Sequence, residues 1–127
     1  MGITDRIDAI TAIPERSRVV DPPPPKSVKI EVTARCNFRC FFCATSHGLR
    51  QVGHMERSLY SKIIRNLRVS GVEEIGVFYL GESFLLPWLP ELIAEAKAVG
   101  FPYVFLTTNG QLATPEKVEE CILAGLD

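Results

Sequence analysis

Apolar and polar residues follow two different periods along this chain, and the periods predict strands and helices in turn. Between residues 27 and 32 every second residue is apolar, with Lys29 and Glu31 between them, which predicts a strand. The apolar runs 74–80 and 103–107 are short enough to be strands buried on both faces. Apolar residues at helical spacing follow each predicted strand, in the segments 59–70, 92–99 and 116–124.

Residues typical of helix ends bound these three segments. Ser58 is the predicted cap of the first helix, and Thr114 with Pro115 opens the third. The second helix follows a loop that holds Pro87 and Pro90. A glycine comes directly after each predicted helix: Gly71, Gly100 and Gly125.

The predicted order is therefore β-α-β-α-β-α, an α/β fold. Such alternation favours parallel strands, right-handed crossovers and helices that cover the sheet. Three β/α units cannot close a barrel, and the sequence given ends at Asp127, where a further strand would be due. We expect a truncated portion of a partial (β/α) TIM-like barrel.

A short N-terminal segment precedes this pattern. Isoleucines at roughly helical spacing predict a helix over 3–13, and Pro14 ends it. The prolines of 22–25 predict a stiff connector. We therefore divide the chain into an N-terminal helix and proline-rich linker, 1–26, and a body, 27–127.

The composition narrows the class of protein. Of the 127 residues, 46% are hydrophobic and 23% charged, and the formal net charge is −1, which indicates neither a basic field for nucleic acid nor an acidic one for cationic partners. Neither a membrane-spanning run nor a signal-peptide core is visible. We expect a cytoplasmic protein with reduced cysteines.

Three of the four cysteines, Cys36, Cys40 and Cys43, fall within eight residues. Reduced thiolates at this spacing indicate an iron–sulfur cluster or zinc, and three ligands leave one corner of a four-iron cluster open. His47 would complete a tetrahedral zinc site, so a non-enzymatic zinc- or cluster-binding module is the alternative. Cys121 is expected to be a buried apolar residue.

Polar residues also follow the other two predicted strands. Gly81 and Glu82 end the second, and Thr108 and Asn109 end the third. The carboxyl ends of parallel strands meet at one edge, where ligands of α/β sheets bind. These residues are therefore expected to lie beside the cysteine loop.

The run from Cys36 to Cys43, with an aromatic residue before its last cysteine, resembles the signature of the radical S-adenosylmethionine (radical SAM) enzymes. Its place after the first strand matches as well. The resemblance implies that Cys36, Cys40 and Cys43 hold a [4Fe–4S] cluster whose fourth iron is chelated by S-adenosylmethionine. It also implies that Phe42 lies against the adenine.

Two further stretches extend the resemblance. Leu80-Gly81-Glu82 is similar to the family's Gly-Gly-Glu-like stretch, with Leu80 in place of the first glycine. Glu82 would accept a hydrogen bond from the methionyl ammonium. Thr108 and Asn109 are similar to the polar end of the family's third strand, which borders the cofactor pocket.

The resemblance covers roughly residues 27–127, as the first half of an incomplete radical SAM core domain. It implies reductive cleavage of S-adenosylmethionine to a 5′-deoxyadenosyl radical that abstracts hydrogen from a substrate. The implied partners are a small-molecule or peptide substrate, a reductant such as flavodoxin or ferredoxin, and the missing C-terminal part of the barrel. These 127 residues alone are expected to be inactive.

Overall fold

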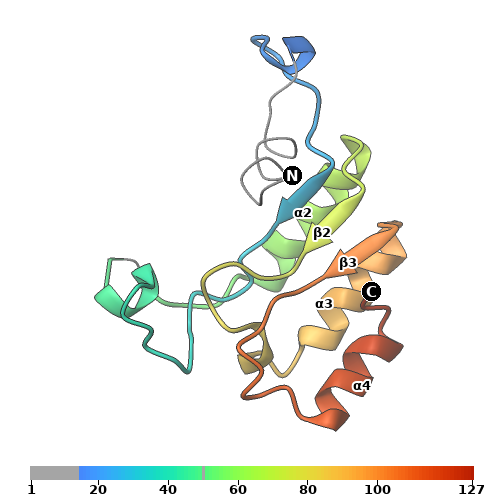
Figure 1. Cartoon of the computed structure of the whole chain (residues 1–127). Helices are drawn as coiled ribbons and strands as arrows, with labels where there is room; N and C mark the ends of the chain where they lie inside the picture. Colours follow the sequence, from blue (N-terminus) through green and yellow to red (C-terminus); the bar gives the residue numbers. More distant parts are fainter. Residues whose placement is uncertain (1–14, 50) are drawn as a thin grey trace, which may run out of the picture.

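The computed structural model describes residues 15–49 and 51–127. Three short strands, β1 (Ser27–Lys29), β2 (Glu74–Gly76) and β3 (Tyr103–Phe105), form a parallel sheet in the order β1-β2-β3 (Figure 1). Ser27 pairs with Glu74, which in turn pairs with Tyr103, so the strands are in register at their first residues. All three strands therefore end at the same edge.

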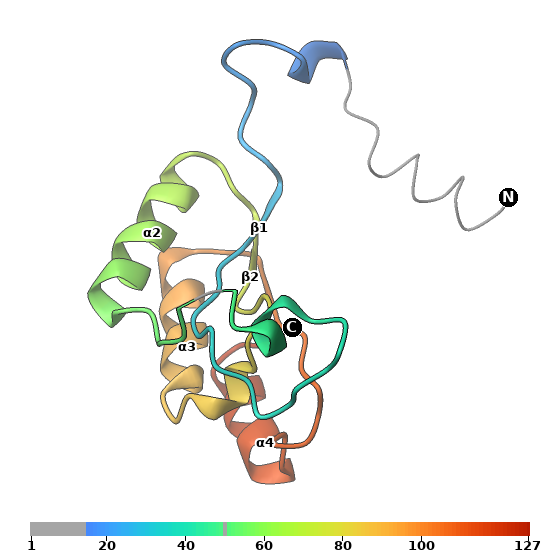
Figure 2. The same ribbon diagram turned by 90° about the vertical axis from the view of Figure 1, so that its left-hand side faces the viewer.

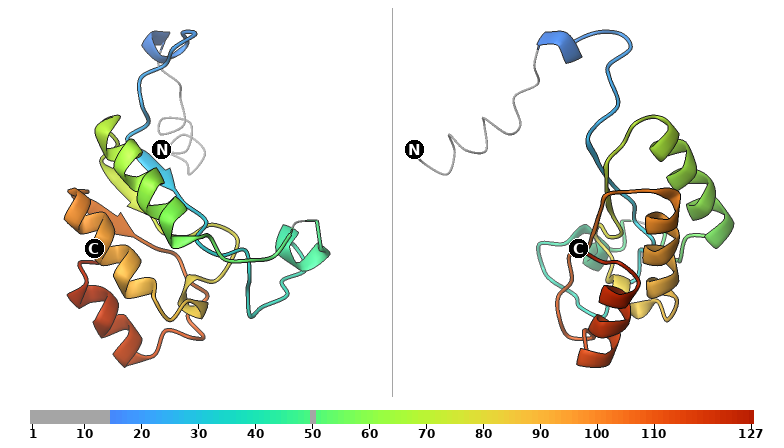
Figure 3. Two further views of the ribbon diagram at one scale, coloured as in Figure 1. Left: turned by 180° about the vertical axis from the view of Figure 1, so that it is seen from behind. Right: turned by 90° about the vertical axis from the view of Figure 1, so that its right-hand side faces the viewer.

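Helices α2 (Arg57–Val69), α3 (Leu89–Val99) and α4 (Pro115–Leu123) cover one face of this sheet. In Figure 3 (left) all three lie in front of the strands, and Figure 2 shows the sheet edge-on beside them. The remaining elements are single 3-10 turns: η1 (Glu15–Ser17), η2 (Ala44–His47) and η3 (Ser83–Leu85). The predicted β-α-β-α-β-α order and the α/β class are confirmed.

The core lies between the sheet and these helices. Apolar residues of the strands and of the segments that continue them are buried there: Ile75 and Val104 in β2 and β3, and Ile30, Val32 and Val77 just past β1 and β2. The helices contribute the apolar side chains on the faces they turn inward, among them Tyr60, Ile64, Leu92, Ile93 and Cys121. Cys121 is 1% exposed, which confirms that it is a core residue.

The helix boundaries agree with the prediction, except that α2 and α3 begin at other residues than predicted. Thr114 Oγ1 accepts a hydrogen bond from the Lys117 N–H at 3.4 Å, as an N-cap should. However, α2 begins at Arg57 after Glu56, which forms no side-chain cap bond, so the predicted Ser58 cap is wrong. Pro90 belongs to the first turn of α3 rather than to the loop, because a proline there gives up an N–H that the helix does not use.

The regular strands are shorter than predicted, with three residues each. Hydrogen bonding continues briefly past them: the Ile30 N–H donates to the Gly76 carbonyl at 2.7 Å, and that of Val77 to Phe105 at 2.9 Å. Beyond these bonds the chain leaves the sheet. The extended segments that follow are therefore free to turn their side chains toward a site.

A second pairing closes the loop that carries the cysteines. Thr33 and His54 form an antiparallel bridge, flanked by hydrogen bonds from Ala34 N–H to Gly53 and from Met55 N–H to Val32, both 2.9 Å. The loop thus leaves and rejoins the body at one place. Figure 1 shows it projecting beyond the ends of the strands.

The helix predicted over 3–13 lies outside the described residues. The described part of the linker, 15–26, is largely exposed and leads away from the sheet (Figures 1 and 2). Within 15–49 and 51–127, every helix falls short of the length and apolarity that a membrane span needs.

Candidate functional site

A cavity of about 460 Å³ lies at the carboxyl edge of the sheet. Its walls come from the cysteine loop and from the segments that follow β2 and β3. It is lined by all eight residues predicted for the site: Cys36, Cys40, Phe42, Cys43, Gly81, Glu82, Thr108 and Asn109. Phe38, Tyr79 and Thr107 also line it, as does Leu80, which stands in place of the family's first glycine. The convergence predicted from the strand order is therefore present.

Glu82 is the buried centre of this edge, with an exposed fraction of 2%. Both of its carboxylate oxygens accept a hydrogen bond from the Thr108 hydroxyl at 2.9 Å. The backbone N–H of Asn109 donates to the same carboxylate at 2.9 Å, and that of Phe84 at 3.0 Å. Glu82 therefore ties the end of β2 to the end of β3, and these bonds offset the cost of burying its charge.

Gly81 allows the segment after β2 to approach the segment after β1. A Cβ at this position would lie 1.9 Å from the Thr33 carbonyl oxygen and 2.9 Å from that of Arg35. The neighbouring Glu82 N–H donates to the same Arg35 carbonyl at 2.9 Å. Glycine is required here by space, since both obstacles are backbone atoms. The position of Leu80 is held by its N–H, which donates to Glu31 Oε1 at 3.1 Å.

Asn109 links the end of β3 to the cysteine loop. Its side-chain Nδ2 donates to Asn37 Oδ1 at 2.9 Å and lies 3.9 Å from the Cys36 Sγ. Asn37 in turn donates to Gln111. Asn37 and Gln111 were not predicted. The only sequence signal for Asn37 is its position directly after Cys36, and Gln111 gave none.

The three loop cysteines are free thiols and each is half-buried. The Phe38 N–H donates to the Cys36 Sγ at 3.4 Å, an interaction of the kind that tunes metal–sulfur sites. Within 15–49 and 51–127, no three His, Cys, Asp or Glu side chains are grouped to hold a single metal ion. A four-iron cluster takes one thiolate on each of three irons, so its ligands are spaced more widely than those of one ion.

The phenylalanines of the loop are not packed into the core. Phe42 is 78% exposed and Phe41 84%, and their rings meet edge to face with centroids 5.3 Å apart. Phe42 also lines the cavity.

The His47 imidazole is bound to a backbone carbonyl of the cysteine loop. Its Nε2 lies 2.6 Å from the Phe41 carbonyl oxygen, with which it shares a hydrogen bond. A zinc site of the alternative kind would use the other ring nitrogen, Nδ1, while Nε2 stays on this carbonyl.

Comparisons with known proteins agree with the fold and the motif. The Radical SAM superfamily model matches residues 30–127. A GTP 3′,8-cyclase from Chlorobaculum tepidum is 39% identical over 101 residues, which cover 79% of this chain and 30% of the cyclase. The tungsten-containing aldehyde ferredoxin oxidoreductase cofactor-modifying protein of Pyrococcus furiosus is 31% identical over 105 residues, covering 80% of this chain and 29% of that protein.

A solved structure supports the architecture. The crystal structure of BtrN in complex with AdoMet and 2-DOIA superimposes with a TM-score of 0.71 at 20% identity, covering 80% of this chain and 42% of BtrN. At that identity the likeness shows the fold, here a partial (β/α) barrel.

The parallel sheet with a three-cysteine loop at its carboxyl edge defines an α/β protein of the partial-barrel class. With the match over 30–127, the chain belongs to the radical SAM superfamily. It spans about 30% of the length of the two relatives named above.

Proposed function

We propose that this chain carries the cofactor-binding edge of a radical SAM enzyme. In this proposal Cys36, Cys40 and Cys43 hold a [4Fe–4S] cluster, and S-adenosylmethionine occupies the cavity beside them. When bound, these groups supply the reductive cleavage of S-adenosylmethionine into methionine and a 5′-deoxyadenosyl radical, which abstracts hydrogen from a substrate. The observation that carries the proposal is that one cavity is lined by all the residues predicted for both cofactors.

The donor set fits a three-cysteine cluster. The thiols are free of disulfides, they line a common cavity, and the loop that carries them is held at both ends while its middle is exposed. Three protein ligands leave one coordination position for a small molecule, which separates a reactive site from a closed structural one.

The other lining residues have chemistry that suits S-adenosylmethionine. Phe42 offers an aromatic face to the adenine, and Gly81 brings the backbone close. A carboxylate has roughly four acceptor positions, and three donor groups contact that of Glu82. Glu82 can therefore accept one further hydrogen bond, from the methionyl ammonium, while Thr108 and Asn109 fix its orientation.

The proposal also defines the partners. A one-electron reductant such as flavodoxin or ferredoxin must reach the cluster, and the substrate, a small molecule or a peptide, must reach the cavity. The remaining strands of the barrel would complete the substrate pocket. Free cysteines of this kind fit a cytoplasmic location.

Anaerobic reconstitution of the chain with iron and sulfide tests the proposal. We expect about four irons per chain, a brown chromophore, and an electron paramagnetic resonance signal of the reduced protein that changes when S-adenosylmethionine is added. Cys40→Ala should abolish all three, and Cys121→Ala serves as the matched control that should retain them.

His47→Ala separates this proposal from the zinc alternative. We expect the variant to incorporate iron as the unsubstituted chain does, since the three cysteines alone hold the cluster in this proposal. A colourless chain that binds zinc, and that loses it on His47→Ala, would refute the iron–sulfur assignment.

A further inference from the structure

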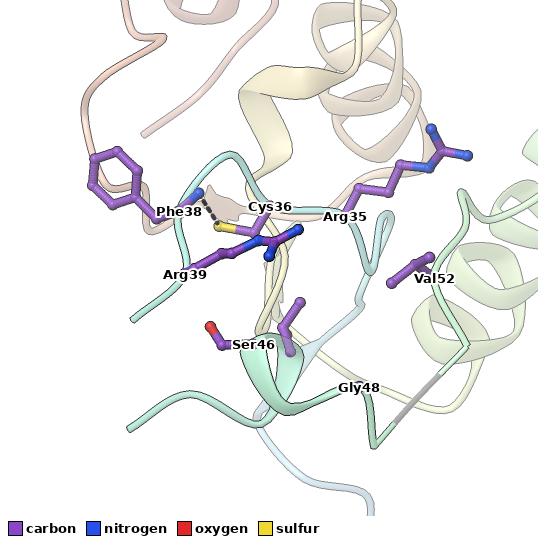
Figure 4. Close-up of a pocket in the computed structure, with 8 residues that line it drawn as sticks. Arg35, Cys36, Phe38, Arg39, Ser46, Gly48 and Val52 are labelled. Atoms are coloured by element: carbon purple, nitrogen blue, oxygen red, sulfur yellow. Dashed lines mark hydrogen bonds between the residues drawn. The ribbon is translucent and has the colours of Figure 1, made fainter. Parts of the chain in front are cut away.

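A second cavity, of about 430 Å³, lies on the cysteine loop. Its walls include Arg35, Cys36, Phe38 and Arg39 from the first part of the loop and Thr45 and Ser46 from η2 (Figure 4). It shares only Cys36 and Phe38 with the cavity described above, so the two are neighbours with different remaining walls. Its volume lies within the range of about 300 to 1,000 Å³ that is usual for small-molecule sites.

Two hydroxyl groups in this cavity lack hydrogen-bond partners. Thr45 Oγ1 and Ser46 Oγ are buried, and within 15–49 and 51–127 they are the side-chain polar atoms that are both buried and unpaired. A buried hydroxyl without a partner is costly and uncommon in folded proteins. Two in succession on the wall of one cavity indicate a ligand that offers acceptors to both.

The charge around the cavity has a single sign. Between Glu31 and Glu56 the sequence contains three arginines and neither Asp nor Glu. Among the described residues, neither the Arg35 nor the Arg39 guanidinium takes part in an ion pair or a side-chain hydrogen bond. This part of the chain is therefore cationic although the whole chain carries a net charge of −1.

The two arginines are placed differently. Figure 4 shows the Arg39 side chain between Cys36 and Ser46, on the inside of the loop, whereas the Arg35 guanidinium extends to the outer margin. Arg39 and Ser46 thus face one space, which Thr45 also lines, and Arg35 can only assist from its rim.

We propose that this cavity binds a phosphate group of a small-molecule ligand, with Arg39 as its main cation and the Thr45 and Ser46 hydroxyls as further donors. A guanidinium pairs with two oxygens of an oxyanion in a planar fork. A carboxylate held in this way keeps only the second acceptor position of each of its two oxygens, whereas a phosphate has further, unshared oxygens that can accept from both hydroxyls. The site shares the Cys36 wall with the proposed cluster but takes its donors from Arg39, Thr45 and Ser46, so it can be tested on the chain without the cluster or S-adenosylmethionine.

Titration of the anaerobically purified chain with pyrophosphate, followed by ³¹P nuclear magnetic resonance, tests the proposal. Arg39→Gln should weaken binding about tenfold or more, as loss of a charge-assisted bidentate pair implies. Arg35→Gln should weaken it only about two- to threefold. Arg65→Gln, which removes the same charge from the exposed face of α2, should leave it unchanged. Equal losses in all three variants, or no saturable binding, would overturn the proposal.

Thr45→Val combined with Ser46→Ala distinguishes ligand binding from a structural role. Removal of two unpaired buried hydroxyls should leave the melting temperature of the ligand-free chain unchanged or raise it, and should abolish the rise that pyrophosphate produces in the parent. A lower melting temperature with the pyrophosphate effect intact would assign the hydroxyls to folding instead.

Poly-glutamate, titrated in parallel, separates a phosphate from an acidic protein surface. We expect pyrophosphate to bind at concentrations where poly-glutamate, matched in charge, binds weakly. If poly-glutamate alone binds, and Arg39→Gln removes that binding, the arginines serve a protein partner and the phosphate site is refuted.

Discussion

The helix-covered body and the cysteine loop of this chain differ in which kinds of side chain they bury and expose. In the body, Ile64, Ile75 and Ile93 are completely buried, and the side chains between sheet and helices are almost all apolar. In the loop, Phe41 and Phe42 are largely exposed while two hydroxyls are buried without partners. The apolar and polar groups of the loop are thus placed in the reverse of the usual way.

The difference indicates that most of the folding free energy comes from the body. Burial of apolar side chains stabilises the body without any ligand. The loop is attached to it by a few specific bonds, among them the Thr33–His54 bridge at its base and the Asn37–Asn109 bond at the strand ends. The loop can therefore adapt to what it binds without a large cost to the fold, and substitutions in the two regions should act on different properties.

The largest effect on stability is expected at the junction of the two regions. Gly81→Ala should lower the free energy of unfolding by about 4 kcal/mol, because the new Cβ would meet the Thr33 carbonyl oxygen at 1.9 Å and a backbone atom cannot move aside. Gly53→Ala is the matched control, since a Cβ there meets nothing within 4 Å and should change stability by less than about 0.5 kcal/mol. Urea unfolding of both variants measures the difference, and equal values would disprove the close approach.

Substitutions of a core residue and of a loop residue should also have very different effects on the free energy of unfolding. Ile93→Ala should cost about 3 kcal/mol, the sum of lost burial and a cavity, because Ile93 is 0% exposed. Phe41→Ala removes a larger side chain that is 84% exposed, and should cost less than about 0.5 kcal/mol. The same unfolding assay applies, and a costly Phe41→Ala would show that the loop is part of the core.

Glu82→Gln should cost about 2 kcal/mol, because an amide offers one acceptor oxygen where the carboxylate offers two, and one buried N–H donor would lose its partner. Thr108→Val tests the same network from the other side. If the two groups contact each other as described, the double variant should lose less than the sum of the single losses. Glu119→Gln, an exposed carboxylate on α4, is the control and should be near neutral.

The smallest expected effect is a pH dependence of stability that comes from Tyr60. Burial, reinforced by the charge of Glu95, raises the pKa of Tyr60 above its ordinary value of 10.0. The neutral phenol donates to the Leu92 carbonyl at 2.9 Å. Its contribution is therefore complete below pH 10 and declines as the pH rises from the unfolded-state pKa toward the higher folded-state pKa.

Unfolding at pH 8 and pH 11 measures this contribution. Tyr60→Phe should lose about 1 kcal/mol at pH 8, the value of one hydrogen bond, and less at pH 11. Parallel pH profiles for the two proteins would contradict the assignment to Tyr60.

Much of the fold could be predicted from local sequence, because periodicity and helix-end residues report local forces. The alternation around Lys29, the cap at Thr114 and the glycines after the helices all appear in the structure at their predicted places. The starts of α2 and α3 were misplaced because Ser58 and Pro90 each suit the first turn of a helix as well as the residues just before it.

The sequence by itself determined the order of the elements, the three-cysteine run and the polar residues at the strand ends. Only the tertiary structure decided that the Glu82 carboxylate turns to Thr108, that Gly81 lies against Thr33, and that Thr45 and Ser46 are buried beside Arg39. The physical reason is distance along the chain. A hydrogen bond between residues 26 positions apart depends on how two strands end side by side, which local periodicity does not encode.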